Sequence, residues 1–399
     1  MNFIILSGGD KVIIIDKPYV SEFLVDSIVQ NDWEVLENET IKLSNIEEGA
    51  FTTLSTKEAV EHYDPMRYPI IYSNSENSID WVLENLPETE LSRYIKIFKD
   101  KVEFRENLKN IFPDFYYRSV NYEDLKKINL DELKYPLVLK PAIGFLSLGV
   151  HTINNDDEWK KALFALEAEM QAAQKLYPQS VVDASKFIIE EYVDGEEFAI
   201  DAYFDKNGQP VILNIFQHPL LNSQDVRDRI YLMSVGIMVK YMAKFAMVLK
   251  QIGDAFDVRN FPFHIELRVT NEEKIIPIEI NPMRFSGWCT ADVAEYAWGI
   301  NVYEYFMEQK KPDWNSILSE ASRGVYYFSM AEVPNGVDRA RIKSFDYEKY
   351  LSNFSKVLEV RRINPRNNPL FAVVFGQTND KEEIKRILQL KTKDYLILS

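Results

Sequence analysis

The sequence predicts a mixed α/β fold, and three observations lead to this prediction. Short apolar runs typical of strands alternate with helix-like runs along the 399 residues. Residues 263–281 have the pattern of two antiparallel strands joined by a polar turn. The hydrophobic content of 46% is sufficient to bury two or three cores of typical size.

Both ends of the chain show the alternation of an α/β domain. In the first 94 residues, strand-like runs occur at 3–6, 12–15 and 70–72, and helix-like runs at 20–31 and 78–86. After residue 310, strand-like runs at 324–330 and 371–375 alternate with helix-like runs near 347–354 and 381–390. The pattern predicts an α/β region on each side of the central part.

The charge and cysteine content exclude several classes of protein. The 46 Lys plus Arg and 62 Asp plus Glu give a net charge of −16, which argues against nucleic acid or an anionic membrane as the main partner. One cysteine, Cys289, rules out an intrachain disulfide, and with no signal-peptide pattern it predicts a cytoplasmic protein. The most apolar helix-like segment, 231–250, contains Lys240 and Lys244, so we expect an amphipathic helix and no membrane span.

The predicted antiparallel strand pair carries the strongest functional signal. Pairing about a turn centred at 272–273 places Glu266 opposite Glu279 and His264 opposite Asn281. The apolar residues expected on the opposite face are Ile265, Leu267, Ile278 and Ile280. Like charges directly opposite each other destabilise a sheet, so the arrangement needs a compensating cation. Two carboxylates and an amide carbonyl suit Mg²⁺, which prefers oxygen ligands.

Two upstream segments have the chemistry that a nucleotide site requires. A short apolar run ends at Lys140 beside a loop bracketed by Gly144 and Gly149, whose amides could cover phosphates. The loop is not a Walker A motif, because its lysine precedes the glycines. Residues 187–201 have the pattern of two strands joined by a turn at Asp194-Gly195, and the chain leaving the first strand can offer backbone groups to adenine.

Each segment by itself also has a simpler explanation. The strand pair could be a solvated hairpin with an acidic face, Lys140 a surface lysine, and Asp194 part of an acidic surface turn. The order and spacing of the segments are more specific than any one of them.

Together the segments resemble the ATP-grasp superfamily, in particular its carboxylate–amine ligases. The shared order is a lysine near the start of the nucleotide-binding region, a second lysine before a small-residue loop, a hinge of the form Glu-Glu-Tyr-Val-x-Gly-x-Glu, and an acidic pair ending in Glu-x-Asn. The resemblance covers about residues 95–310. It implies an ATP-grasp fold of two α+β lobes enclosing the nucleotide, an N-terminal α/β domain over 1–94 and a C-terminal α/β cap over 311–399.

The resemblance implies a role for individual residues. The residues expected to hold the phosphates of ATP are Lys101, Lys140 and, in the loop, Ser147. The residues expected to line adenine and ribose are Glu190, Glu191, Val193 and Glu197. The residues expected to bind Mg²⁺ or Mn²⁺ are Glu266, Glu279 and Asn281. In this assignment, Glu191 and Val193 contact adenine through the backbone and Glu197 takes the ribose hydroxyls.

The sequence departs from the family pattern in two places. The loop after Lys140 carries Phe145, Leu146 and Leu148, where many relatives have small or hydroxyl residues. The family often has an arginine directly after Asn-Pro, whereas here Met283 precedes Arg284.

Three arginines are candidates for contacting the transferred phosphoryl group or its acceptor. Arg284 is the favoured one, because it follows the predicted strand pair of residues 263–281, here named the metal strands, and precedes a Ser-Gly pair that leaves room for a ligand. Arg227 and Arg229 lie between the hinge and the metal strands, where relatives bind substrate, but could equally pair with the aspartates beside them. His218 and His264 could serve as a base or simply satisfy hydrogen bonds.

The resulting hypothesis is an ATP-dependent carboxylate–amine ligase that forms an acylphosphate, joins it to an amine as an amide, and releases ADP and phosphate. Its partners would be small-molecule carboxylates and amines, and a homodimer is compatible with it. The alternatives are an ATP-grasp carboxylase or kinase, and a nucleotide-binding protein without turnover. The presence of both lysines and all three presumed metal ligands disfavours the last alternative.

Overall fold

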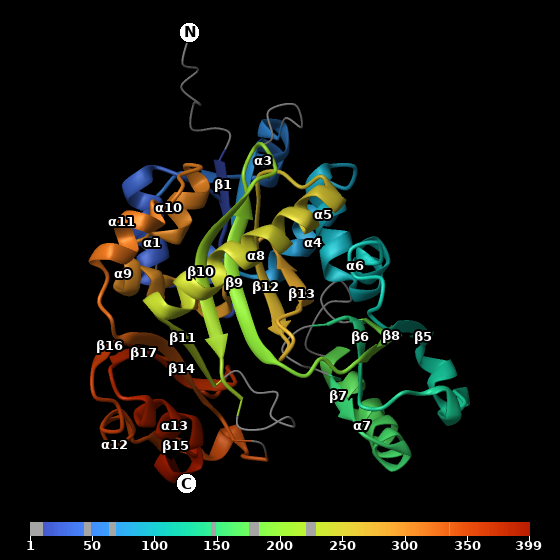
Figure 1. Ribbon diagram of the computed structural model, residues 1–399. Coiled ribbons are helices and arrows are strands. Elements are labelled where there is room, and N and C mark those ends of the chain that lie inside the picture. Colours follow the sequence, from blue (N-terminus) through green and yellow to red (C-terminus); the bar gives the residue numbers. More distant parts are fainter. Residues whose placement is uncertain are drawn as a thin grey trace.

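The structure is a computed structural model that describes residues 11–43, 49–63, 69–144, 149–174, 183–220, 229–334 and 336–399. The described residues form a four-stranded parallel sheet, a four-stranded antiparallel sheet, an eight-stranded sheet and a strand pair, with helices packed around them (Figure 1). The predicted α/β class is therefore confirmed. The strand predicted at 3–6 lies outside the described residues.

The predicted N-terminal domain contains a parallel sheet with the strand order β3-β2-β1-β4. Its strands are β1 (Lys11–Ile14), β2 (Glu34–Leu36), β3 (Thr53–Leu54) and β4 (Ile70–Ser73). Its helices are α1 (Glu22–Asn31), α2 (Glu39–Leu43), α3 (Thr56–His62) and α4 (Ile79–Asn85). Helix α1 begins after Ser21, whose side chain accepts a hydrogen bond from the Leu24 amide. At the end of β4, the Ser73 amide donates to the Met283 carbonyl at 3.0 Å, which joins this sheet to the chain that follows the metal strands.

A small lobe follows, built on an antiparallel sheet of order β5-β8-β6-β7. Its strands are β5 (Tyr117–Asn121), β6 (Leu137–Ile143), β7 (His151–Ile153) and β8 (Asp183–Glu191). The helix α7 (Asp156–Gln174) packs against it, and Leu137, Leu139, Trp159, Phe187 and Ile189 lie in its core. Helices α5 (Glu90–Lys99) and α6 (Lys101–Leu108) connect the N-terminal domain to this lobe.

The central and C-terminal parts of the chain share one eight-stranded sheet of order β13-β12-β9-β10-β11-β14-β17-β16 (Figure 1). Its first strands are β13 (Ile275–Pro282), β12 (Phe261–Val269), β9 (Glu196–Phe204) and β10 (Pro210–His218). The others are β11 (Ile230–Met233), β14 (Val325–Glu332), β17 (Leu370–Thr378) and β16 (Val357–Arg362). Three strands of the predicted C-terminal cap therefore continue the sheet that begins with the metal strands. The predicted domain boundary near residue 310 stays a prediction.

The helix predicted at 231–250 is wrong at its start. Residues Ile230–Met233 form β11, and α8 (Val235–Phe256) begins only after Ser234, whose hydroxyl caps it by accepting from the Ile237 amide. The remaining helices are α9 (Val293–Trp298), α10 (Val302–Met307), α11 (Trp314–Glu320), α12 (Tyr347–Leu351) and α13 (Lys381–Gln389), and the strand pair is β15 (Ile342–Phe345) with β18 (Leu396–Leu398). Within the described ranges, no helix has both the length and the apolar character needed to cross a membrane.

The predicted turn at Asp194-Gly195 carries the chain from one sheet to the other. Strand β8 belongs to the small lobe, whereas β9 belongs to the eight-stranded sheet. A Cβ at Gly195 would lie 2.3 Å from the Val269 carbonyl oxygen, so only glycine fits where this hinge passes the end of β12. The hinge therefore runs along the edge of the space between the two lobes.

Candidate active site

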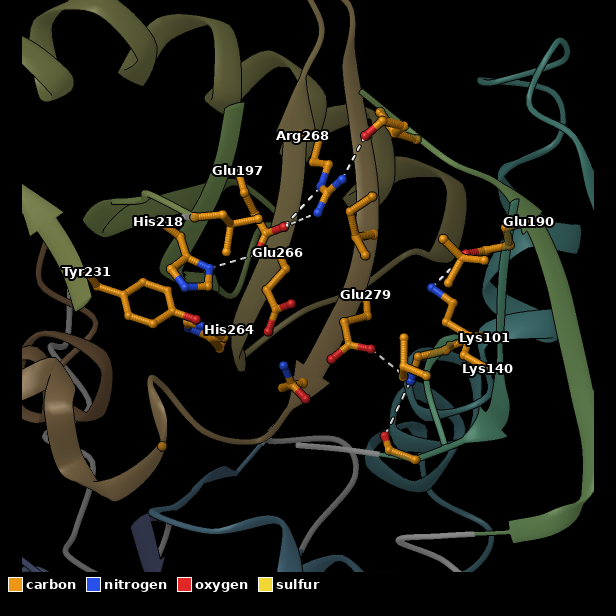
Figure 2. A pocket seen from close by; sticks show the side chains of 18 of the residues that line it. Lys101, Lys140, Glu190, Glu197, His218, Tyr231, His264, Glu266, Arg268 and Glu279 are labelled. Atoms are coloured by element: carbon orange, nitrogen blue, oxygen red, sulfur yellow. Dashed lines mark hydrogen bonds and ion pairs between the residues drawn. The ribbon is translucent and has the colours of Figure 1, made fainter. Parts of the chain in front are cut away.

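A pocket lies between the small lobe and the eight-stranded sheet (Figure 2). Of the predicted site residues that the structure describes, all except Arg229 line it. These lining residues are Lys101, Lys140, Glu190, Glu191, Val193, Glu197, Glu266, Glu279, Asn281 and Arg284. Figure 2 shows Lys140 and Glu190 on the small-lobe side, Glu266 and Glu279 in the middle, and His218 on the far side.

The predicted register of the metal strands is confirmed. Glu266 on β12 pairs with Glu279 on β13, and His264 pairs with Asn281. Because side chains on a strand alternate between faces, all four lie on the face that lines the pocket. The strand pair therefore places two carboxylates and one amide within a short stretch of one sheet surface.

A bulge in β13 changes the face of one residue. Leu267 pairs with Pro277, so the register skips Ile278. The prediction that Ile278 lies on the apolar face with Ile265 is wrong, because Ile278 lines the pocket beside Glu279. The turn between β12 and β13 is one residue shorter than unbroken pairing from the two glutamates would give. The bulge takes up this difference, so the two glutamates stay opposite each other.

Lys101 supplies a cation to one of the facing carboxylates, Glu279. Its Nζ lies 2.8 Å from Glu279 Oε2 and 3.3 Å from the Gly144 carbonyl oxygen. Burial would raise the pKa of Glu279, but Lys101 and Lys140 outweigh it and hold this pKa below its usual value. Burial would likewise lower the pKa of Lys101, but Glu279 raises it above its usual value. Both groups are therefore charged at neutral pH.

Glu190 binds two cations at the small-lobe end of the pocket. Its Oε2 lies 2.6 Å from Lys140 Nζ, and its Oε1 accepts a hydrogen bond of 2.6 Å from Arg105 Nε. Arg105 also donates from Nη1 to the Pro277 carbonyl at 2.7 Å and so links α6 to both lobes. Burial would raise the pKa of Glu190, but Arg105 and Lys140 lower it to about 2.

Sequence reasoning missed Arg105. It lies four residues after Lys101 on α6, and this spacing places both side chains on one face of the helix. Both side chains are buried. Two basic residues four apart, just before the small lobe, were the signal that could have identified it.

At the other end of the pocket, Glu197 is held by two neighbouring strands. It accepts hydrogen bonds from Arg268 Nε at 2.9 Å and Nη2 at 2.7 Å, and His218 Nδ1 lies 2.8 Å from its Oε1 (Figure 2). Arg268 Nη1 also donates to the Val193 carbonyl at 2.8 Å, which ties the hinge to β12. Burial would raise the pKa of Glu197, but His218 and Arg268 lower it to about 2.

His264 is oriented by a fully buried carboxylate. Its Nδ1 lies 2.8 Å from Asp201 Oδ1, which also accepts a hydrogen bond of 2.8 Å from the Ser286 amide. Asn214 donates to the other oxygen of Asp201 at 3.2 Å. This network fixes the imidazole next to Glu266 and joins β12 to the segment that follows the metal strands.

Arg284 reaches the pocket through a turn made by the additional residue before it. Met283 is fully buried with a φ of 65°, and its carbonyl accepts the hydrogen bond from Ser73. Arg284 donates from Nε and Nη2 to Glu76 Oε1 at 2.9 and 2.5 Å, and from Nη1 to the Phe285 carbonyl at 2.9 Å. The additional residue therefore turns the chain so that Arg284 meets both the pocket and the N-terminal domain.

Three predicted residues are not brought into the pocket by the described structure. Ser147 and Arg227 lie outside the described residues, as do Phe145, Leu146 and Leu148. Arg229 is described, and its Nη1 donates to the Leu388 carbonyl at 2.5 Å. Because Arg229 contacts the C-terminal region and does not line the pocket, the geometry favours Arg284.

The donor set fits a hard divalent cation. Glu266, Glu279 and Asn281 present two carboxylates and an amide oxygen to one pocket. Among the described residues, no group of three His, Cys, Asp or Glu could hold a metal by itself. A site of this kind suits Mg²⁺, which usually keeps several positions for phosphate oxygens and water.

Comparison with protein families identifies the central part of the chain. Residues 133–292 match the family described as the ATP-grasp domain. This match contains Lys140, the hinge and both metal strands. The central part of the chain has the ATP-grasp fold. The resemblance inferred from the motifs is thus confirmed.

Solved structures with the ATP-grasp fold align over nearly the whole chain. An L-amino acid ligase from Bacillus licheniformis has a TM-score of 0.67 at 16% identity and covers 98% of both chains. An N5-carboxyaminoimidazole ribonucleotide synthetase from Thermotoga maritima has a TM-score of 0.63 at 15% identity, with 97% of this chain and 99% of that chain covered. A biotin carboxylase from Campylobacter jejuni has a TM-score of 0.61 at 13% identity, with 98% and 92% covered. A comparison with curated proteins gave no match.

Proposed function

We propose that the protein is an ATP-dependent carboxylate–amine ligase that forms an amide through an acylphosphate. The observation that carries this proposal is the set of groups that one pocket of an ATP-grasp domain brings together. The hinge, Lys140 and Lys101, the facing carboxylates and Arg284 all line this pocket. This set suits a phosphoryl donor held by the hinge and the lysines and a negatively charged acceptor beside the arginine.

The hinge end would bind the adenosine part of ATP. Arg268 donates a hydrogen bond to the Val193 carbonyl, and the Val193 N–H group would contact adenine. Glu197 has carboxylate oxygens on the pocket wall, where they can accept hydrogen bonds from ribose hydroxyls. Because Arg268 binds both the hinge and Glu197, it would keep the adenine contact of Val193 and the ribose contact of Glu197 in a fixed position relative to each other.

Binding of the triphosphate would require both lysines to exchange partners. Lys140 is paired with Glu190 and Lys101 with Glu279, so each would turn from a carboxylate to a phosphate oxygen. Arg105 would still compensate Glu190 after that exchange. When bound to Glu266, Glu279 and Asn281, Mg²⁺ would neutralise charge on the phosphates.

The reaction would proceed in two balanced steps. An oxygen of the substrate carboxylate attacks the γ-phosphorus, the bond to the β–γ bridging oxygen breaks, and ADP leaves with that electron pair. The amine then attacks the acyl carbon, the carbon–oxygen bond to phosphate breaks, and the amine nitrogen loses a proton. Arg284 would hold the acceptor carboxylate or the oxyanion of the tetrahedral intermediate. No covalent bond to the protein is needed.

A carboxylase is the second candidate, because a biotin carboxylase shares the fold. An L-amino acid ligase and a phosphoribosylglycinamide synthetase with the same fold support the ligase assignment. A kinase would stop after the first step, and a regulatory protein would bind nucleotide without turnover. Both lysines and all three oxygen donors line one pocket, which favours turnover.

The assignment can be tested by supplying ATP and Mg²⁺ with amino acids and small carboxylates, singly and in pairs. A ligase releases phosphate only when a carboxylate and an amine are both present, and mass spectrometry detects the amide. A kinase would consume ATP with one acceptor and leave the phosphate on it, whereas a carboxylase would require bicarbonate. Tight nucleotide binding without ADP formation in any mixture would contradict the proposal.

The variant Arg284→Lys tests the acceptor side. An ammonium cannot reproduce a planar two-pronged contact, so we expect kcat/KM for the acceptor to fall by about tenfold or more while the Kd for ATP is unchanged. The exposed Arg323 offers a matched control, and Arg323→Lys should change neither value. Equal losses of ATP binding and catalysis in Arg284→Lys would place this arginine in the nucleotide site.

A further inference from the structure

Glu76 is a buried carboxylate at the end of the N-terminal sheet. It begins the 3₁₀ helix η2 (Glu76–Ser78), which follows β4 closely, and only 4% of its surface is exposed. Hydrogen bonds between serines shape this loop: Ser73 Oγ donates to the Ser75 carbonyl at 2.8 Å, and Ser75 Oγ accepts from the Asn77 amide at 3.2 Å. The position of Glu76 is therefore fixed by its own loop.

Two cations from other parts of the chain meet at Glu76. Its Oε1 accepts hydrogen bonds from Nε and Nη2 of Arg284, at 2.9 and 2.5 Å, and its Oε2 accepts from Lys99. The Lys99 ammonium also lies 3.4 Å from the Gly144 carbonyl, the same carbonyl that Lys101 contacts at 3.3 Å. Glu76 thus binds both Arg284 and Lys99, and Lys99 in turn contacts the Gly144 carbonyl.

The contacts of Arg284 leave two of its N–H groups without an acceptor among the described residues. An arginine has five N–H groups. Glu76 and the Phe285 carbonyl take one each from Nε, Nη2 and Nη1, so within the described residues one N–H remains on each Nη. Those two N–H groups can bind a carboxylate through two parallel hydrogen bonds. A Cβ at Gly287 would lie 3.9 Å from Nη1, so this glycine leaves space beside that nitrogen.

The charge of Glu76 is secured by its partners. Burial would raise the pKa of Glu76, but Lys99 and Arg284 lower it to about 2. The carboxylate is therefore ionised at neutral pH. Together, one carboxylate and two cations leave a net positive charge, which suits an anionic acceptor group beside Arg284.

We propose that Glu76 is the positioning residue for Arg284. This inference rests on the proposed function, because it takes Arg284 as the group that holds the acceptor carboxylate or the oxyanion. Glu76 does not line the pocket, so it would act on the acceptor through Arg284. Without Glu76, the guanidinium could turn about its side-chain bonds and would have to be reoriented at each binding event.

Kinetics of Glu76→Gln test the proposal in the full-length protein. We expect the KM for the acceptor to rise, or its kcat/KM to fall, by about tenfold or more, with the KM for ATP within about twofold of the wild type. Glu76→Asp retains the charge and should recover part of the loss. An unchanged acceptor KM and kcat in a folded Glu76→Gln protein would overturn the proposal. If Glu76→Gln does not fold, the same comparison is made with Glu76→Asp, for which equal changes in both KM values would overturn it.

A matched control removes a different carboxylate that joins the N-terminal domain to the rest of the chain. Glu308 pairs with Lys11 at 2.5 Å, accepts a hydrogen bond of 2.9 Å from Trp33, and does not line the pocket. Glu308→Gln should lower thermal stability and leave the ratio of the two KM values unchanged. A change of this ratio as large as that in Glu76→Gln would show that general loosening of the domain is responsible.

Chemical labelling tests the same contact without any enzymatic activity. Phenylglyoxal adds to guanidinium groups, and peptide mass spectrometry can follow its reaction at Arg284 relative to the exposed Arg323. We expect Arg284 in the protein without ligands to react severalfold faster after Glu76→Gln, because two of its nitrogens lose their acceptor. An unchanged rate would overturn the proposal. If the wild type shows no ATP-dependent turnover, the proposed function fails, but the labelling still decides whether Glu76 holds Arg284.

Discussion

The two ends of the pocket hold their carboxylates in different ways. At the far end, Glu197 is the direct cross-strand neighbour of both Arg268 and His218 in the ladder of β12, β9 and β10. At the small-lobe end, Glu190 on β8 is bound by Lys140 on β6 and by Arg105 on α6. The contacts of Glu197 depend on the register of one sheet. The contacts of Glu190 depend on how β8, β6 and α6 pack against one another.

The charges also differ between the two ends. At the small-lobe end, Lys101, Lys140 and Arg105 form their ion pairs with two carboxylates, Glu190 and Glu279. The Nη2 atom of Arg105 is buried and has no hydrogen-bond partner among the described residues. A buried excess of positive charge is costly unless an anion compensates it. We therefore expect Lys101 and Lys140, at the small-lobe end, to exchange their ion-pair partners when ATP binds. The contacts of Glu197 at the other end should remain unchanged.

Glu279→Gln should have the largest effect, because Glu279 lies where the two ends meet. We expect turnover to fall by about 100-fold or more, since several kcal/mol of charge stabilisation depends on a metal ligand. Repulsion between facing carboxylates would by itself predict a more stable variant. Lys101 would lose its ion-pair partner, however, so we expect the free energy of unfolding to fall by about 1–3 kcal/mol. Kinetics and urea denaturation measure both effects, and normal turnover would contradict the metal assignment.

Lys140→Met tests whether the small-lobe end exchanges partners. We expect the Kd for ATP to rise by about tenfold, which corresponds to about 1.4 kcal/mol. Thermal stability should change little, because Arg105 still compensates Glu190. Calorimetric titration with ATP measures the affinity, and Lys160→Met, at an exposed lysine of α7, is the control. Wild-type affinity in Lys140→Met would make Lys140 a purely structural residue.

At the Glu197 end, Arg268→Met should affect stability more than it affects ATP binding. We expect the Kd for ATP to change less than in Lys140→Met, because the guanidinium of Arg268 is bound to Glu197 and to the hinge carbonyl. The free energy of unfolding should fall by about 3 kcal/mol, as is typical when one partner of a buried ion pair is removed. If Arg268→Met weakened ATP binding more than Lys140→Met, the distinction between a fixed and an exchanging end would be wrong.

The last prediction concerns stability against acid, where the expected effect near neutral pH is the smallest. Glu190 and Glu197 both have a pKa of about 2 in the folded protein, below their ordinary value of 4.5. A carboxyl group whose pKa is lower in the folded state stabilises the fold fully above the unfolded pKa and loses this contribution as the pH falls toward the folded one. The denaturation midpoint should thus change little from pH 8 to 5 on account of these groups and fall between about pH 4.5 and 2. Equal midpoints at pH 6 and 3 would show that the carboxylates are not held as described.

Local pattern was sufficient to predict the metal strands and the hinge. Alternation of apolar and polar residues fixes which side chains share a face, and the short polar turn limits the register, so the pairs Glu266–Glu279 and His264–Asn281 followed from the sequence. The glycine of the hinge was likewise visible as a turn signal, although its close approach to Val269 was not. The role of each residue toward ATP or an acceptor stays a prediction until the variants are measured.

Contacts between distant segments could not be predicted in this way. Arg105 and Glu190 are 85 residues apart, and Glu76 and Arg284 are 208 residues apart, so no periodicity relates them. The bulge at Ile278 was also missed, because a skipped residue leaves no mark in an alternating pattern. The start of α8 was misplaced because Tyr231 fits both a helix and a strand, and pairing with β14 decided for the strand.

The sequence by itself determined the metal strands, the hinge and most of the charged residues that line the pocket, because these depend on neighbouring residues along the chain. Only the tertiary structure decided which carboxylate each cation meets. Burial makes an unpaired charge costly, so the packed lobes join Lys101 to Glu279, Lys140 and Arg105 to Glu190, and Arg284 to Glu76. Which partner is within reach depends on how the domains pack, and no local sequence pattern predicts that packing.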